Sequence, residues 1–207
     1  MSIQIDFKTV LGMEYAIKFM RNPYESWDKS DSEIHFKTTH QELHIGNNDR
    51  MLMDNLCKAG PEHRKYMRMI NAYFEIKAPL YWWKEFDTYK IGTVCNSSST
   101  MHLLAKRNLT IDDFSTDQLF SDGVTLLIRV IEQLNYYRRR YNETGNKAYW
   151  YNMIQLLPSS YMQHRGVMLN YETLHNIYNQ RKNHKLNEWH KFCDKLTELP
   201  MHSLITS

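Results

Sequence analysis

The sequence predicts an α+β protein with more helix than strand, and three patterns support this class. Residues 2–12 alternate apolar and polar side chains, which is typical of a half-buried strand. Residues 70–76 alternate in the same way and stop at Pro79, so they predict a second strand. Residues 123–143 carry apolar side chains at helical spacing and predict one long helix.

The remaining elements follow from periodicity and from end signals. Helices are predicted at residues 14–20, 47–60, 80–90, 145–158, 170–182 and 186–199. Polar and turn residues predict a loop at 21–33, and they predict a loop or the start of a helix at 92–102. We expect a single domain spanning residues 1–207, with a helical segment at about 120–157.

Composition and charge narrow the class of partner. The 207 residues include 42% hydrophobic and 24% charged side chains, as in ordinary globular proteins. The formal net charge is +3, and the lysines and arginines are spread along the chain. This permits an anionic ligand but does not indicate a nucleic-acid partner.

Cysteine usage and apolar runs bear on location. Cys57, Cys95 and Cys193 are odd in number, lie far apart and form no CxxC pair, which fits a reducing compartment. No run of 18 apolar residues and no signal peptide is visible. We therefore expect a cytoplasmic protein without a membrane span.

Two patterns could carry metal or thiol chemistry, and neither is favoured. His40 and His44 have the spacing of a helical metal pair, but only Glu42 lies nearby and the segment could be a strand, so no metal site is predicted. Cys95 precedes a polar run and could be a nucleophile, yet a small buried cysteine is the simpler interpretation.

Two polar clusters could meet an anion. Hydroxyls and backbone amides at a helix entry can bind phosphate, and one such run contains Asn96, Ser97, Ser98 and Ser99. The arginines at 138–140 point in three directions on the predicted long helix. They are therefore interpreted as a solvated helix end.

The helix at 170–182 carries an unusual arginine. At about 100° per residue, Asn170, Leu174, Ile177 and Arg181 fall within roughly 60° on one side. Surface helices normally keep charge on the opposite side. Arg181 therefore either marks the edge of the buried face or meets an anion there.

The spacing in this region resembles a known family. Leu157 and Pro158 precede Asn170, and Asn176 and Arg181 follow it at fixed intervals. This arrangement is similar to that of the flavin-dependent thymidylate synthases (ThyX), which make thymidylate without the usual cysteine-based enzyme.

A second block, residues 62–86, resembles the same family through the separation of His63 and Pro79. The family's signature is Arg-His-Arg followed by seven residues and a Ser. Carried forward, this register aligns the Arg-His-Arg with Thr88, Tyr89 and Lys90, and the Ser with Ser98. The similarity covers roughly residues 60–102 and 150–195.

The chain departs from the family pattern at several positions. Thr88 and Tyr89 replace the first two members of Arg-His-Arg, and Glu172 and Ile154 stand where the family has arginines. Candidate replacements for the missing cations are Lys84, Arg165 and the arginines at 138–140.

The resemblance implies a fold, a reaction and a site. It implies an antiparallel sheet with long helices, assembled as a homotetramer. The implied reaction is the FAD-dependent methylation of dUMP to dTMP with methylene-tetrahydrofolate and NADPH. Two alternatives stay open: another C5 modification of a pyrimidine nucleotide, such as hydroxymethylation, or a non-catalytic nucleotide-binding relative.

The resemblance also implies a role for each matched residue. Arg181 would be the catalytic residue that holds the pyrimidine ring, because its fork of donors suits a carbonyl-imide edge and stabilises negative charge on the ring. Ser98 would meet the phosphate, together with its neighbours Asn96, Ser97 and Ser99. The residues implied to contact FAD are His63, Lys90, Asn170 and Asn176.

Overall fold

The computed structural model describes residues 2–36 and 41–207 and divides them into two compact units. The first unit contains residues 2–6, 75–88 and 95–166, and the second contains residues 7–36, 41–74, 89–94 and 167–207. The predicted α+β class, with antiparallel strands and long helices, is confirmed. The single domain expected for residues 1–207 stays a prediction.

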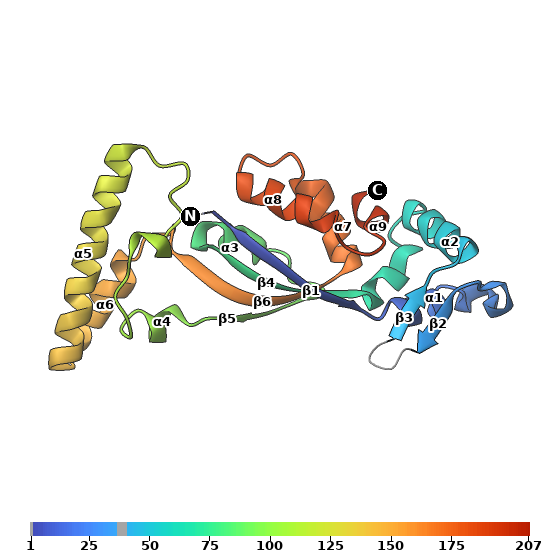
Figure 1. Ribbon diagram of the computed structural model, residues 1–207, viewed down its shortest axis with the longest axis horizontal. Helices are drawn as coiled ribbons and strands as arrows, with labels where there is room; N and C mark the ends of the chain where they lie inside the picture. The colour runs from blue at the N-terminus through green and yellow to red at the C-terminus, as the bar shows by residue number, and fades with distance from the viewer. Residues whose placement is uncertain (1, 37–40) are drawn as a thin grey trace. The chain divides into compact units, whose positions relative to one another are not determined.

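Four strands form the main sheet in the order β1-β4-β6-β5, and the division between the units falls inside each of them (Figure 1). They are β1 (Gln4–Leu11), β4 (Asn71–Pro79), β5 (Thr93–Ser97) and β6 (Met162–Asn170). The strands predicted at 2–12 and 70–76 correspond to β1 and β4. By contrast, β6 is a strand for which the sequence gives no prediction, and β5 occupies a segment predicted as a loop or helix start.

The first unit is built around two helices that lie side by side, α5 (Ser121–Thr144) and α6 (Lys147–Leu156) (Figure 1). The predicted long helix is confirmed as α5, whose buried Leu127, Ile131 and Leu134 repeat at helical spacing. The unit also contains α3 (Leu80–Phe86), α4 (Thr100–Leu103) and η4 (Ile111–Asp113). The members of its main apolar cluster are Leu104, Leu109, Phe114, Leu127, Ile131, Leu134, Met153 and Tyr161.

Helix α3 carries an aromatic cluster that anchors it in the first unit. Trp82, Trp83 and Phe86 are almost fully buried, with ring centroids 4.9 to 5.2 Å apart. The indole nitrogen of Trp83 donates a hydrogen bond of 3.0 Å to the carbonyl of Gln163 in β6. The helix ends at Phe86, earlier than the predicted residue 90.

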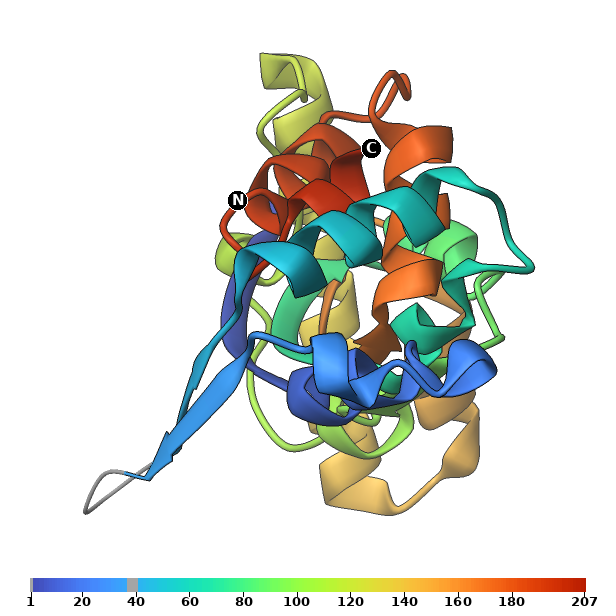
Figure 2. The same cartoon turned by 90° about the vertical axis from the view of Figure 1, so that its right-hand side faces the viewer.

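The second unit contains a two-stranded antiparallel hairpin and most of the short helices. In the hairpin, β2 (Glu33–Phe36) pairs with β3 (Gln41–His44), which leads into α2 (Asn47–Lys58) (Figure 2). His44 lies in a strand, and His40 lies outside the described residues. Within residues 2–36 and 41–207, no group of three or more His, Cys, Asp or Glu residues could hold a metal ion.

Helix α7 (Tyr171–Arg181) contacts three other helices of this unit. Helix α7 packs against α8 (Asn187–Leu196), α9 (Ser203–Thr206) and the 3-10 helix η3 (Arg64–Met69). The unit also contains α1 (Met13–Phe19) and two 3-10 helices, η1 (Asn22–Tyr24) and η2 (Trp27–Lys29).

A buried ion pair holds the start of α2. Asp49 is fully buried and accepts hydrogen bonds from Arg21 Nε (2.7 Å), Ser30 Oγ (2.6 Å) and Ser32 Oγ (2.6 Å). Burial of the carboxylate opposes its ionisation, but these hydrogen bonds and the charge of Arg21 outweigh it and lower the pKa of Asp49. Asp49 therefore stays ionised and ties α2 to the segment before β2.

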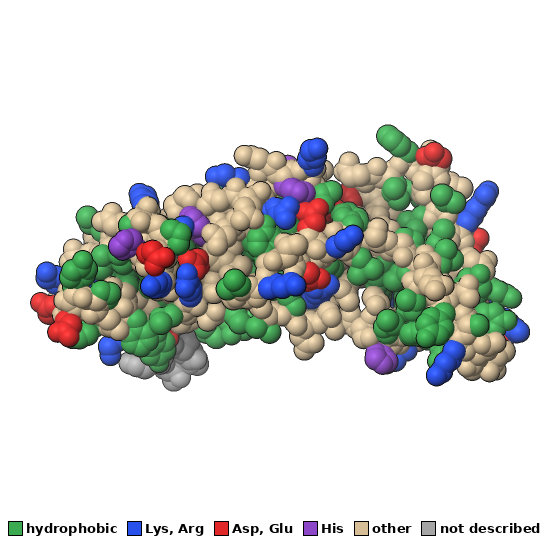
Figure 3. Space-filling view, turned by 180° about the vertical axis from the view of Figure 1, so that it is seen from behind, with side chains coloured by type: hydrophobic (Ala, Val, Ile, Leu, Met, Phe, Trp, Pro, Cys, Tyr) green, Lys and Arg blue, Asp and Glu red, His purple; other side chains and the backbone are tan. Residues whose placement is uncertain are grey.

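Charges are dispersed over the face drawn in Figure 3. Lysines and arginines alternate there with acidic and apolar side chains and do not merge into one basic patch. In the part of the chain that the structure describes, no helix is both long and apolar enough to cross a membrane.

Candidate functional site

The predicted site residues divide between the two units. Arg181, His63, Lys90, Asn170 and Asn176 belong to the second unit, and the polar run at 96–99 belongs to the first. Each group is therefore described within its own unit.

In the second unit, Asn170 begins α7 and caps it. Its side-chain oxygen accepts a hydrogen bond of 2.9 Å from the backbone N–H of Thr173, and its own N–H donates to the carbonyl of Gly92 at 3.0 Å. The hydroxyl of Thr173 donates to the carbonyl of Ile91 at 2.8 Å. The turn at residues 91–92 is thus bound to the start of α7, and the oxygen of Asn170 is engaged in capping.

Gly92 permits this close packing. Its φ is +69°, a left-handed conformation that favours glycine, and a Cβ built there would lie 2.0 Å from the side-chain nitrogen of Asn170. Lys90, one of the predicted cofactor contacts, directly precedes this turn and is exposed.

Arg181 ends α7 and is held by two aromatic side chains. Its Nε donates a hydrogen bond of 2.8 Å to the hydroxyl of Tyr89. Its guanidinium carbon lies 4.8 Å from the ring centroid of Trp189 and 5.5 Å from that of Tyr89. Arg181 is therefore an oriented, partly buried cation rather than a freely moving residue at the edge of the helix.

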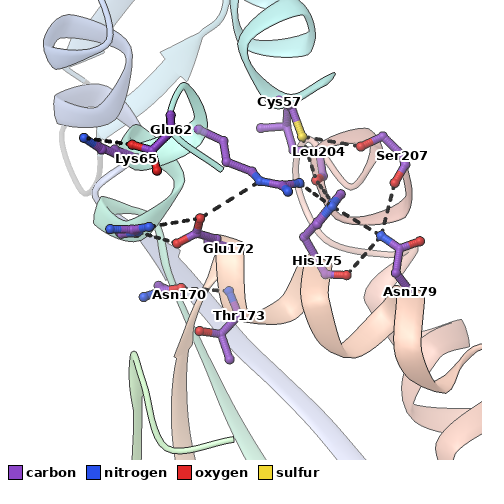
Figure 4. A network of polar contacts seen from close by, with 12 residues as sticks. Cys57, Glu62, Lys65, Asn170, Glu172, Thr173, His175, Asn179, Leu204 and Ser207 are labelled. Carbon is purple, nitrogen blue, oxygen red and sulfur yellow. Dashed lines mark hydrogen bonds and ion pairs between the residues drawn. The ribbon is translucent and has the colours of Figure 1, made fainter. Parts of the chain in front are cut away.

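Glu172, the acidic departure from the family pattern, is neutralised by arginines from η3. Its carboxylate binds the guanidinium of Arg68, and its Oε1 lies 4.0 Å from Nε of Arg64 (Figure 4). This Nε is buried and has no hydrogen-bond partner among the residues that the structure describes. The first turn of α7 therefore lies beside two cations, although α7 itself supplies a carboxylate.

His175 continues this network toward α9 (Figure 4). Its Nδ1 lies 3.1 Å from the carbonyl of Leu204, which can only accept, so Nδ1 carries the proton. Its Nε2 then accepts from Arg64, 2.5 Å away. Burial, followed by the nearby charge of Arg64, lowers the pKa of His175 and keeps the imidazole neutral.

Two other predicted cofactor contacts are exposed. His63 immediately precedes η3, and Asn176 lies on the solvent side of α7. Because η3 and α7 pack against each other, His63 at the start of η3 and Asn176 on α7 belong to the same part of the second unit as Arg64 and Arg68.

In the first unit, the polar run joins β5 to α4. The hydroxyl of Ser99 accepts from the backbone N–H of His102 at 3.3 Å and caps α4. The backbone N–H of Ser98 donates to the carbonyl of His164 at 2.8 Å. Asn96 and Ser97 are exposed at the end of β5. Of the segment 92–102, which is predicted as a loop or the start of a helix, the C-terminal end does begin the helix α4, whereas residues 93–97 form a strand.

Three of the cations considered as replacements, Arg138, Arg140 and Arg165, make other contacts, and Lys84 and Arg139 are exposed. Arg165 pairs with Asp87 at 2.6 Å and lies 4.2 Å from the ring centroid of Trp83. Arg138 donates to the side chain of Asn108, and Arg140 pairs with Glu143 at 2.8 Å. The arginines that sequence reasoning missed are Arg64 and Arg68, whose spacing in a polar segment gives no distinctive signal.

Cys95 shows no sign of an activated thiol. Its side chain is exposed, so the expectation of a buried cysteine is wrong. Partial desolvation nevertheless raises its pKa, and the nearby charge of Arg165 only partly opposes this effect. The thiolate form that a nucleophile requires is therefore disfavoured.

No family model and no curated protein sequence matches the chain. Among solved structures, Thymidylate Synthase X from Helicobacter pylori with FAD and dUMP is 19% identical, with a TM-score of 0.71 over 99% of this chain and 96% of that one. A second structure of the flavin-dependent thymidylate synthase ThyX from Helicobacter pylori, complexed with FAD and dUMP, is 18% identical, with a TM-score of 0.72 over 98% and 97%.

A UMP/dUMP methylase, PolB from Streptomyces cacaoi, bound with 5-Br dUMP, also matches. It is 14% identical, with a TM-score of 0.65 over 99% of this chain and 95% of that one. Nearly the whole length is matched in all three structures. The chain therefore has the fold of the flavin-dependent thymidylate synthases.

Proposed function

We propose that the chain is a flavin-dependent enzyme that converts dUMP to dTMP, using methylene-tetrahydrofolate as the carbon source and NADPH as the reductant. The observation that carries the proposal is Arg181, held in a defined orientation at the end of α7. The fold supports it, because two of the similar structures contain FAD and dUMP and a third is a UMP/dUMP methylase.

Arg181 would bind the carbonyl-imide edge of the uracil ring. Negative charge builds on this ring when C5 is modified, and a fixed guanidinium stabilises such charge without having to reorganise. Ser98 and its neighbours Asn96, Ser97 and Ser99 would bind the phosphate through hydroxyl and amide groups.

The residues of η3 and α7 fit an anionic dinucleotide such as FAD. The exposed His63 and Asn176 offer hydrogen bonds, Lys90 offers a positive charge, and Arg64 has a buried donor in need of an acceptor. Asn170 fits less well through its oxygen, which caps α7, so its contribution would come from the side-chain nitrogen. FAD in its reduced form would supply the hydride.

Arg64 and Arg68 would supply the positive charge that the family's arginine provides at the position of Glu172 on α7. They provide two positive charges beside the single negative charge of Glu172, so the local balance stays cationic even with a glutamate on the helix. In this proposal the working assembly is a cytoplasmic homotetramer.

The purified protein provides the test. We expect a yellow protein with a flavin absorbance spectrum, and NADPH oxidation that dUMP stimulates. Arg181→Ala should strongly weaken dUMP binding measured by calorimetry, leaving only the residual affinity of the phosphate contacts, while circular dichroism and the elution volume stay unchanged. Arg129→Ala, at an exposed arginine of α5 outside the 138–140 cluster, is the matched control and should bind normally. A colourless protein that takes up no added FAD contradicts the proposal.

A second candidate function is non-catalytic nucleotide binding. It is favoured by the capping role of Asn170 and by the replacement of family residues at Thr88, Tyr89 and Glu172. A protein that binds dUMP but neither FAD nor NADPH would support this alternative.

Another C5 modification of the nucleotide is tested separately. Mass spectrometry of the product distinguishes methylation from hydroxymethylation.

A further inference from the structure

Arg181 lies in the angle between two aromatic rings of the second unit. The rings of Tyr89 and Trp189 have centroids 6.1 Å apart and meet at 74°, and the guanidinium is close to both. Trp189 is fully buried and also contacts Phe192, with ring centroids 5.9 Å apart. One wall of this corner is therefore a rigid part of the core.

The hydroxyl of Tyr89 links Arg181 to its neighbour on α7. It accepts the Nε–H of Arg181 at 2.8 Å and donates its own proton to the side-chain oxygen of Gln180 at 3.0 Å. Because Gln180 offers an acceptor, the lone pair of the Tyr89 oxygen stays directed at Nε. The Tyr89 hydroxyl thus accepts a hydrogen bond from Arg181 and donates one to Gln180.

Fixing Nε fixes the plane of the guanidinium. With Nε bound to Tyr89, the remaining N–H donors of the guanidinium belong to its two terminal nitrogens, whose directions follow from the same plane. An arginine side chain otherwise loses much of its rotamer entropy when a ligand immobilises it. Restraint before binding reduces that loss.

We propose that Tyr89 is a positioning residue that aims the terminal nitrogens of Arg181 at the base of the nucleotide. This inference rests on the proposed function. It assigns a role to a residue at which the chain departs from the family's Arg-His-Arg, and it requires no contact between Tyr89 and the ligand.

Tyr89→Phe tests the proposal because it keeps the ring and removes only the hydroxyl. We expect the affinity for dUMP to fall about tenfold, the effect of losing one hydrogen bond to a charged group. The affinity for deoxyribose 5-phosphate, which has no base, should stay unchanged, whereas a general structural defect would weaken both ligands.

Two comparisons complete the experiment. In an Arg181→Ala background, Tyr89→Phe should cause no further loss of affinity, because the residue that it positions is gone. Tyr149→Phe is the matched control, since Arg140 lies 5.6 Å from the Tyr149 ring centroid in the other unit, and it should bind dUMP like the wild type.

The outcomes separate the two proposals. A wild-type protein that does not bind dUMP rejects the proposed function, and the role of Tyr89 falls with it. If the wild type binds dUMP, then an unchanged affinity in Tyr89→Phe overturns the positioning role alone. An equal loss for both ligands, or a further loss in the Arg181→Ala background, overturns it as well.

Discussion

Replacing Glu172 with arginine restores the residue type that the family carries at this position, yet we expect it to destabilise the chain. The carboxylate of Glu172 is 13% exposed and lies between Arg64 and Arg68. A third arginine would remove the only negative charge bound to these two side chains by the described contacts. The structure therefore predicts a cost where a simple comparison of sequences would predict an improvement.

The magnitude follows from the two ion pairs. Unit charges 4 Å apart interact by about 4 kcal/mol at an effective dielectric constant of about 20. Arg64 and Glu172 approach this case, with charged atoms 4.0 Å apart and side chains 14% and 13% exposed. Arg68 is 52% exposed, so solvent screens its pair to about 1 kcal/mol or less. Since long side chains can turn away, we expect Glu172→Arg to cost about 3 kcal/mol in total.

Urea unfolding followed by tryptophan fluorescence measures this cost as a shift of the midpoint at constant m-value. Adding Arg68→Glu to Glu172→Arg should recover part of the loss, because opposite charges face each other again. Glu143→Arg is the control, since its pair with Arg140 is exposed and should cost less than about 1 kcal/mol. A Glu172→Arg variant as stable as the wild type, or no recovery in the double variant, would refute this reasoning.

Three further predictions concern stability. Burial lowers the pKa of His175 in the folded state, so the unfolded chain binds a proton at this residue more readily. The free energy of unfolding should therefore fall as the pH drops below about 6.5, by at most about 1.4 kcal/mol per pH unit. In urea unfolding, His175→Gln should flatten this pH dependence. Asp49→Ala leaves Arg21 buried without its carboxylate and should lower the free energy of unfolding by about 3 to 5 kcal/mol. An unchanged midpoint of thermal unfolding would contradict this. Leu134→Ala should cost about 2 to 5 kcal/mol, and a smaller shift in the urea midpoint would mean that the α5–α6 core readjusts.

The fold could be predicted where burial follows a local period. Helix α5 shows its buried face through Leu127, Ile131 and Leu134. Strand β6 is not visible in this way, because the polar side chains of Gln163 and Arg165 find partners far along the chain, at Ser98 and Asp87. Strand β5 is short, largely exposed and at the edge of the sheet, so its identity comes from pairing and not from its own residues.

The candidate site shows the same limit. Spacing indicates that Arg181 lies beside the apolar face of α7, but it cannot indicate Tyr89 or Trp189, because a cation over a ring leaves no repeating pattern. Likewise, Glu172 looks like a reversed charge in the sequence because Arg68 is 104 residues away. Compensation of this kind becomes visible only once the chain has folded.

The contact between Gly92 and Asn170 has a consequence for how such chains can diverge. A side chain at position 92 would require a strained backbone and would collide with the residue that caps α7. Position 92 therefore cannot take a side chain while asparagine is kept at 170. We expect substitutions at 92 to occur only alongside a smaller residue at 170, so the two positions should vary together although they lie 78 positions apart in the sequence.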